Sequence, residues 1–280
     1  MREGVQEWRN PRNRLAILRL HWSADPAKRS EDGRRAMAQL RAEIGDRSWK
    51  REYEIDWTSP EGEPVIPEFN ATTHVRPVTL DPMRRLLRWW DFGFVAPVVL
   101  FAQATPTGQI QVKQELCPFN TPLDQLLPMV RAITADLVRD PTKVFDAGDP
   151  ASVNQTDLGS SADVLLQHGM HLHTSRPGTE VSYAALRARL LKRIWAPPDG
   201  EIPALVIDPA CRNLIEALSG AFHLSPHPPH RPVKQHPYKD LVDALRYGHD
   251  NLDNATRDSY GRDLRAMATA DIQPTYAAGW

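Results

Sequence analysis

The sequence of 280 residues has few cysteines and no long apolar run. Its two cysteines, Cys117 and Cys211, are too few for a disulfide framework or a cysteine-based zinc site, which favours a reducing compartment. No apolar run approaches the roughly 18 residues of a membrane span, and the first three residues, Met-Arg-Glu, do not resemble the start of a signal peptide. Together these absences predict a soluble, cytoplasmic protein.

An excess of positive charge and a nucleotide-binding loop are also missing. Lys and Arg total 34 against 35 Asp and Glu, so the formal charge is −1 and no overall basic field indicates nucleic acid. A local basic patch remains compatible with this balance. The pattern G-x-x-x-x-G-K-[ST] does not occur, so we expect no P-loop site for a nucleoside triphosphate.

Hydrophobic periodicity changes near residue 76 and divides the chain into three parts. Residues 1–76 form a predicted N-terminal arm with a strand at 15–20 and helices at 30–44 and 49–55. Residues 77–255 form the predicted main domain, and residues 256–280 form a polar tail. In the main domain, three strands joined by short turns, ending with 109–116, predict an antiparallel meander.

Helices and strands alternate after this meander. The predicted helices lie at 121–138, 160–167, 180–195, 210–218 and 238–251, and the predicted strands at 142–145, 170–174 and 204–207. This order predicts an α/β fold with a mixed sheet, first an antiparallel meander and then parallel strands, flanked by helices. It is the order expected of a ribonuclease H-like fold.

Four hydrophobic or aromatic residues, Leu86, Leu87, Trp89 and Trp90, lead directly to one carboxylate in the stretch Arg88-Trp-Trp-Asp-Phe-Gly-Phe94. Apolar residues before it and at 98–101 predict two buried strands joined by a turn at 93–97. Carboxylates are rarely buried unless they are paired or bound to a cation. Asp91 is therefore a candidate cation ligand, and the alternative is an aspartate that caps the turn.

Two further acidic pairs fall at comparable places. Asp146 and Asp149 follow the strand after the first long helix, at the end of the strand where open α/β sheets place their sites. Asp240 and Asp243 share one face of the last helix, whose opposite face is apolar. The simpler alternatives are an N-terminal cap for Asp149, ahead of Pro150, and solvated helix acids for Asp240 and Asp243.

Convergent carboxylates repel one another unless cations are present. Hard oxygen ligands suit Mg²⁺ or Mn²⁺, and two such ions about 4 Å apart can activate water and stabilise a leaving 3′ oxygen in phosphodiester cleavage. A zinc site is not expected, because the histidines of the proline-rich loop before the last helix match no zinc-binding spacing. These histidines are His223, His227, His230 and His236.

Basic residues that could contact phosphates form two groups. The first lies in the loop before the last helix and at its start, and it consists of Arg231, Lys234 and Lys239. The second lies on the predicted helix 180–195 and consists of Arg187, Arg189, Lys192 and Arg193. The second group could equally be a solvated helix face, so the first group is the preferred phosphate contact.

Three segments carry a family resemblance. Trp89-Trp-Asp-Phe-Gly93, Asp149-Pro-Ala-Ser152 and Lys239-Asp-Leu-Val-Asp-Ala-Leu-Arg-Tyr247 resemble the acidic motifs of the nuclease domain in large terminase subunits of tailed bacteriophages. The last motif is the most specific. Residues 49–57, 64–69 and 74–75 resemble the connection that precedes this domain, so the resemblance covers roughly residues 20–252.

This resemblance implies a metal-dependent DNA endonuclease of the ribonuclease H-like superfamily. Two Mg²⁺ or Mn²⁺ ions would be held by Asp91, by Asp149 or Asp146, and by Asp243. Asp243 is placed ahead of Asp240 because the family motif has a carboxylate at that position, and Asp240 would support it. Cleavage is expected to show little sequence preference, because nothing in the chain resembles a base-reading helix.

The same resemblance implies partners and a location. The partners would be double-stranded DNA, an ATPase domain or subunit, the portal and the small terminase subunit, in the cytoplasm of a bacterial host. The ATPase half of those proteins has no counterpart in this sequence, so we expect no genome packaging by this chain alone. Two alternatives stay open, a ribonuclease H-like resolvase or recombinase and a non-catalytic module that docks on DNA or portal.

Overall fold

The computed structural model describes residues 4–9, 16–54, 62–93, 97–153, 160–225, 227–228 and 230–252. Three predicted segments lie wholly or partly outside this set: the tail at 256–280, Phe94 of the stretch 88–94, and residues 55–57. The chain divides into two compact units, Met1–Gly62 and Glu63–Trp280, earlier than the boundary at residue 76 expected from the sequence. Within the described residues, no helix is both long enough and apolar enough to span a membrane.

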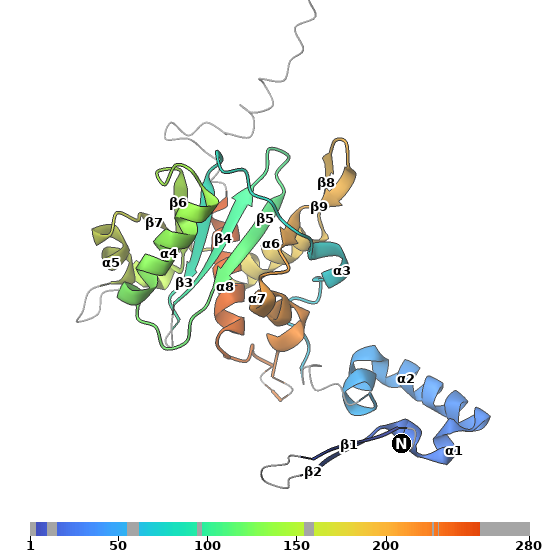
Figure 1. Ribbon diagram of the computed structural model, residues 1–280. Coiled ribbons are helices and arrows are strands. Elements are labelled where there is room, and N and C mark those ends of the chain that lie inside the picture. The colour runs from blue at the N-terminus through green and yellow to red at the C-terminus, as the bar shows by residue number, and fades with distance from the viewer. Residues whose placement is uncertain are drawn as a thin grey trace, which may run out of the picture. The chain divides into compact units, whose positions relative to one another are not determined.

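The first unit is a β-hairpin followed by helices. Its elements are β1 (Val5–Arg9), β2 (Ala16–Leu20), η1 (Trp22–Ala24), α1 (Pro26–Arg29) and α2 (Glu31–Glu52) (Figure 1). The predicted strand at 15–20 is confirmed as β2, whereas β1 was not predicted. The separate helices predicted at 30–44 and 49–55 are wrong, because α2 is continuous through Gly45, and one glycine costs only about 1 kcal/mol in a helix.

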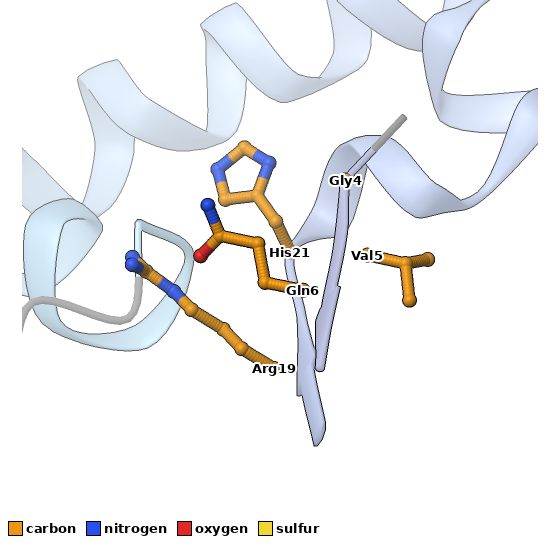
Figure 2. Close-up of a pocket in the computed structure, with 5 residues that line it drawn as sticks. All are labelled: Gly4, Val5, Gln6, Arg19 and His21. Carbon is orange, nitrogen blue, oxygen red and sulfur yellow. The ribbon is translucent and has the colours of Figure 1, made fainter. Parts of the chain in front are cut away.

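A pocket of about 380 Å³ opens beside this hairpin and is lined by Gly4, Val5, Gln6, Arg19 and His21. Figure 2 shows Gln6 and Arg19, which face each other across the two strands, extending to the same side of the hairpin. His21 Nε2 lies 3.1 Å from Glu54 Oε2 and so ties the hairpin to the residues just after α2.

The second unit is built on a six-stranded mixed sheet of order β10-β5-β4-β3-β6-β7 (Figure 1). Its strands are β3 (Leu86–Asp91), β4 (Val98–Ala104), β5 (Ile110–Leu116), β6 (Val144–Gly148), β7 (Leu172–His173) and β10 (Leu205–Ile207). The first three are antiparallel neighbours, and β6, β7 and β10 join the sheet in parallel. The predicted fold class is therefore confirmed.

Helices cover both faces of this sheet. On one face lie α4 (Leu123–Leu137) and α5 (Ser161–Gln167), and on the other lie α6 (Thr179–Leu191), α7 (Arg212–Glu216), η3 (Ala217–Ala221) and α8 (Tyr238–Asp250) (Figure 1). Smaller elements are α3 (Ala71–His74), η2 (Pro150–Val153) and the hairpin of β8 (Arg193–Ala196) and β9 (Gly200–Pro203). Because both faces are covered, β3 is buried along its whole length.

The helix predicted at 180–195 ends earlier, at Leu191. Lys192 already has an extended backbone, and residues 193–196 form β8. Residues 193–196 pair with β9 instead of continuing the helix, and Pro197 disfavours a helical conformation for Ala196 before it. Two of the four basic residues assigned to this helix therefore lie beyond its end.

Strand β3 sends alternate side chains to opposite faces of the sheet. Leu87 and Trp89 join the core beneath α6, α7 and α8, whereas Leu86 and Trp90 join the core beneath α4 and α5. Asp91 has the parity of Trp89, so this alternation places it on the face covered by α8.

Helix α8 rests on Trp89 through a glycine. An ideal Cβ built on Gly248 would lie 2.0 Å from Trp89 Cδ2, far inside van der Waals contact. Trp89 is 1% exposed and lies within a cluster of buried side chains. The absence of a side chain at residue 248 therefore sets how closely α8 approaches β3.

Replacing Gly248 with Ala should lower the free energy of unfolding by about 1–3 kcal/mol, the usual cost of forcing a methyl group into a packed core. At an exposed helical position the same change would stabilise by about 1 kcal/mol, so the sign of the effect tests the contact. Urea unfolding followed by circular dichroism measures it. Gly178→Ala is the comparison without a steric clash: its added Cβ would meet no atom closer than 3.9 Å, so it should lose only the capping preference of glycine over alanine at the N-cap of α6, at most about 1 kcal/mol. A stabilised Gly248→Ala variant would contradict the packing.

Candidate functional site

Asp91 is the last residue of β3 and is only 4% exposed. Burial raises the pKa of this carboxyl well above its ordinary value of 3.8, and the charge of Asp243 raises it further. Lys239 lowers that pKa, whereas Asp240 and Asp149 add to the increase. Four aspartates from three parts of the chain are thus close enough for Asp149, Asp240 and Asp243 to act electrostatically on Asp91.

Asp149 comes beside Asp91 because β6 runs parallel to β3. Gly148 pairs with Trp90, and the Asp149 amide donates a 3.3 Å hydrogen bond to the Trp90 carbonyl. A Cβ on Gly148 would lie 2.8 Å from that carbonyl oxygen, so glycine permits the close approach. Asp149 Oδ1 accepts a 2.8 Å bond from the Ala151 amide. The predicted cap is therefore present, but it uses only one of the two carboxylate oxygens.

Asp240 and Asp243 lie in the first half of α8, and both are buried. Their burial excludes the alternative of solvated helix acids. Asp243 Oδ1 accepts a 3.1 Å hydrogen bond from the Tyr183 hydroxyl and lies 3.1 Å from Arg246 Nη2. Asp240 Oδ2 lies 2.7 Å from His236 Nδ1. Both carboxylates are therefore fixed in orientation by neighbouring side chains.

Asp146 lies on the other face of the sheet. Its two oxygens accept hydrogen bonds from Arg88 Nε and Nη2, at 2.7 and 2.6 Å, and Trp90 Nε1 donates a third at 2.7 Å. Arg88 also donates to Thr134 of α4, and both members of the ion pair are buried. This bidentate pair between β3 and β6 occupies Asp146. The geometry favours Asp149 over Asp146 as the proposed ligand.

Lys239 is the cation nearest to Asp243 Oδ2. Its Nζ lies 2.5 Å from that oxygen and 3.9 Å from Asp240 Oδ1. Burial alone would lower the pKa of this ammonium, but Asp243, Asp91 and Asp240 together raise it. Lys239 is predicted from the sequence to contact DNA, but its spacing of four residues from Asp243 on one helix is a signal for this ion pair.

The roles of Tyr183 and Arg246 were also not predicted. Arg246 lies at the third residue after Asp243 on α8, a spacing that permits an ion pair. Tyr183 lies on α6, 60 residues earlier in the chain, and no local pattern connects it with Asp243. Only the packing of α6 against α8 brings this hydroxyl to the site.

These carboxylates fit a divalent cation in kind, because Mg²⁺ and Mn²⁺ prefer oxygen ligands. The pKa of Asp91 is raised first by burial and then by the charges of Asp243, Asp240 and Asp149, and a bound cation would counteract both causes. In the part of the chain that the structure describes, no three His, Cys, Asp or Glu side chains are gathered closely enough to share one ion.

The first basic group is split by the structure. Arg231 and Lys234 lie in a loop closed as a hairpin, since the Arg231 carbonyl accepts from the Ser225 amide and the Val233 amide donates to the His223 carbonyl. Lys239 instead lies in α8 beside the acids. The loop predicted to contact phosphate therefore carries Arg231 and Lys234, a few residues before the acidic helix.

The second basic group does not form one helix face. Arg187 donates to the Val65 carbonyl, and Arg189 Nη1 donates to the Gly108 carbonyl at 3.4 Å. Lys192 follows the helix, and its carbonyl accepts from the Ala204 amide at the start of β10. Because β10 and β3 run in the same direction, Lys192 and the adjoining Arg193 lie at the edge of the sheet opposite Asp91.

Substituting Asp146 and Asp149 one at a time should show which of the two carboxylates stabilises the fold. Asp146→Asn should destabilise by about 3–5 kcal/mol, because Arg88 would remain buried without its charge partner. Asp149→Asn should change stability by less than about 1 kcal/mol, since Asn caps a turn as well as Asp does. Urea unfolding in metal-free buffer measures both. Equal losses in the two variants would contradict this division.

Asp91→Asn should raise the melting temperature in metal-free buffer, by about 2–4 °C for each kcal/mol of relieved repulsion. The folded-state pKa of Asp91 is raised, so its ionisation costs stability as the pH rises through that value. The gain in melting temperature over the parent should therefore be largest at high pH and should shrink as the pH falls toward 3.8. Differential scanning calorimetry across this range measures it, with Asp136→Asn on the exposed side of α4 as the control. A pH-independent difference would argue against a raised pKa.

No family model and no curated protein matches the chain. Among solved structures, the large terminase of a thermophilic bacteriophage matches with a TM-score of 0.55 and 15% identity, over 68% of this chain and 44% of that one. The same terminase in complex with ATP-γ-S matches with a TM-score of 0.52 and 14% identity, over 81% and 54%. The large terminase nuclease from a second thermophilic phage, with bound magnesium, has a TM-score of 0.46, a likeness too slight to bear on this chain.

The likeness to the first of these terminases concerns the fold, because the identity is low. The chain spans 44–54% of the length of the terminase structures it matches. Over most of its length, this chain has a fold found in the large terminase of a bacteriophage.

Proposed function

We propose that the chain is a metal-dependent DNA endonuclease, the genome-cutting part of a phage DNA-packaging terminase. One observation supports the proposal: Asp149, at the end of β6, and Asp243, on α8, both raise the pKa of the buried Asp91 at the end of β3, so the three carboxylates lie within electrostatic reach of one another on a ribonuclease H-like sheet. The fold shared with the large terminase of a thermophilic phage supports the same conclusion. Because the sequence identity is low, membership of the terminase family is itself proposed.

Asp91, Asp149 and Asp243 would hold two Mg²⁺ or Mn²⁺ ions, with Asp240 in support. When bound between such carboxylates, divalent cations supply the activation of water and the stabilisation of the leaving 3′ oxygen. The protein itself would orient the ligands. Tyr183 and Arg246 fix Asp243, in the way that outer partners orient metal ligands generally.

Arg246 is itself held firmly, which makes it an effective support for Asp243. Its guanidinium lies 4.2 Å from the Tyr247 ring centroid and 5.1 Å from that of Tyr183. Arg246 Nη1 also donates a 3.1 Å hydrogen bond to Ser182 Oγ. Asp243 would thus present its second oxygen, Oδ2, from a fixed position.

DNA would be held by positive charge around the acids, because the carboxylates themselves repel phosphate. Arg231 and Lys234 on the hairpin loop are the first candidates, and Arg187 and Arg189 come second. Lys192 and Arg193 are weaker candidates because they lie at the opposite edge of the sheet. Binding through phosphates is sequence-tolerant and weakens steeply with salt. The proposed partners besides DNA are an ATPase domain or subunit, the portal and the small terminase subunit, and the proposed location is the cytoplasm of a bacterial host.

The ion pair of Lys239 with Asp243 favours one alternative from another class. Lys239 offsets the negative charge of Asp243 without a metal ion, as expected of a non-catalytic module that docks on DNA or portal. Such a module would bind DNA yet cleave none, with or without divalent ions.

Plasmid DNA should be nicked and linearised in Mg²⁺ or Mn²⁺, and left intact in EDTA or in Ca²⁺ alone, which accepts looser coordination than the reaction needs. Asp91→Asn and Asp243→Asn should each lower the cleavage rate by more than the roughly 10–100-fold that is typical when a residue behind a metal ligand is replaced. Asp136→Asn serves as the control and should keep the parental rate. Gel electrophoresis of supercoiled plasmid measures all of these.

Two outcomes would count against the proposal. Cleavage that persists in EDTA would exclude the metal mechanism. DNA binding without cleavage in every divalent ion, unchanged by Asp91→Asn, would instead favour the docking module.

A further inference from the structure

The acidic cluster already contains a cation that belongs to the chain. Lys239 Nζ lies 2.5 Å from Asp243 Oδ2, while Tyr183 and Arg246 engage the other oxygen of the same carboxylate. Both oxygens of a proposed metal ligand are therefore occupied. A divalent ion at Asp243 Oδ2 would lie within a few ångströms of the ammonium, where two positive charges repel strongly in a partly buried site.

Of the two cations on Asp243, only Lys239 is able to leave. The Arg246 side chain is 8% exposed and is held by Ser182 and two tyrosine rings. The Lys239 side chain is 27% exposed and has a flexible four-carbon stem. It begins in the first turn of α8, so it can turn outward without any movement of the helix.

We propose that Lys239 is an internal counter-ion that competes with divalent metal for Asp243. Without metal, its ammonium offsets part of the repulsion among the aspartates. When an ion binds, the ammonium leaves Asp243 Oδ2. This inference rests on the proposed function, and it makes Lys239 a residue that weakens metal binding and stabilises the metal-free protein.

Titration with Mn²⁺, with free Mn²⁺ measured by electron paramagnetic resonance, tests the competition independently of cleavage. Lys239→Met keeps the length of the side chain and removes its charge, so it should bind Mn²⁺ at least about tenfold more tightly than the parent. Lys234→Met is the matched control, because Lys234 lies in the hairpin loop, and it should bind as the parent does. Lys239→Arg retains the charge and should not gain affinity.

Stability gives a second measurement. Lys239→Met should melt at a lower temperature than the parent in EDTA and should recover more of the difference on addition of Mn²⁺. If the metal-free variant is unfolded, circular dichroism during the Mn²⁺ titration should show it refolding. A variant that is as stable as the parent in EDTA and binds Mn²⁺ no more tightly would overturn the inference.

The remaining outcomes separate this inference from the proposed function. Equal Mn²⁺ affinity in the parent and in Lys239→Met would overturn the competition and leave the nuclease proposal standing. Absence of binding in both would overturn the two together. Adding Asp243→Asn to Lys239→Met should abolish the gain in affinity, and a gain that persists would show that Asp243 is not the oxygen donor in competition.

Discussion

Repulsion among aspartates at one edge of the sheet is the constraint on which the rest of the site depends. Asp91 is buried at the end of β3 with three other carboxylates within electrostatic reach, and its pKa is raised as a result. Such an arrangement costs free energy in folding, so positive charge has to offset it. In this structure the offset comes from Lys239 and Arg246, both on α8.

The cluster is assembled by packing rather than by neighbouring sequence. Alternation along β3 aims Asp91 at α8, the parallel register of β6 brings Asp149 alongside, and Gly248 lets α8 settle on Trp89. At Gly148, beside Asp149, and at Gly248, an added methyl group would collide with Trp90 or Trp89, so the backbone approach there leaves no space for a side chain. A charge cluster needs this precision, because the Coulomb energy changes steeply with distance at such short range.

Much of this arrangement could be predicted from the sequence, because the apolar runs of the buried strands and the helical periodicity of α4 and α8 are strong local signals. The choice between Asp146 and Asp149 could not. The two residues are three apart and so point to opposite faces of an extended chain, and only the pairing of Arg88 with Asp146 shows which face is which. That register is a long-range property.

Other features were missed for related reasons. Tyr183 reaches Asp243 only through the packing of α6 on α8, and no local pattern indicates it. Lys239 looked like a DNA contact because it is basic and follows a basic loop, whereas its partner lies on the same helix face. The early end of α6 was missed because residues 193–196 pair with β9, and Pro197 and Pro198 beyond them were a local signal only against a helix that continues to the end of that segment.

A crystal structure of the protein grown with Mn²⁺ and measured at the manganese absorption edge tests the central claim most directly. The account predicts anomalous density between Asp91, Asp149 and Asp243, with the Lys239 ammonium no longer on Asp243 Oδ2 and the Arg88–Asp146 pair unchanged. Manganese bound at Asp146 with Arg88 displaced, or no manganese at the carboxyl ends of β3 and β6 at millimolar concentration, would contradict it.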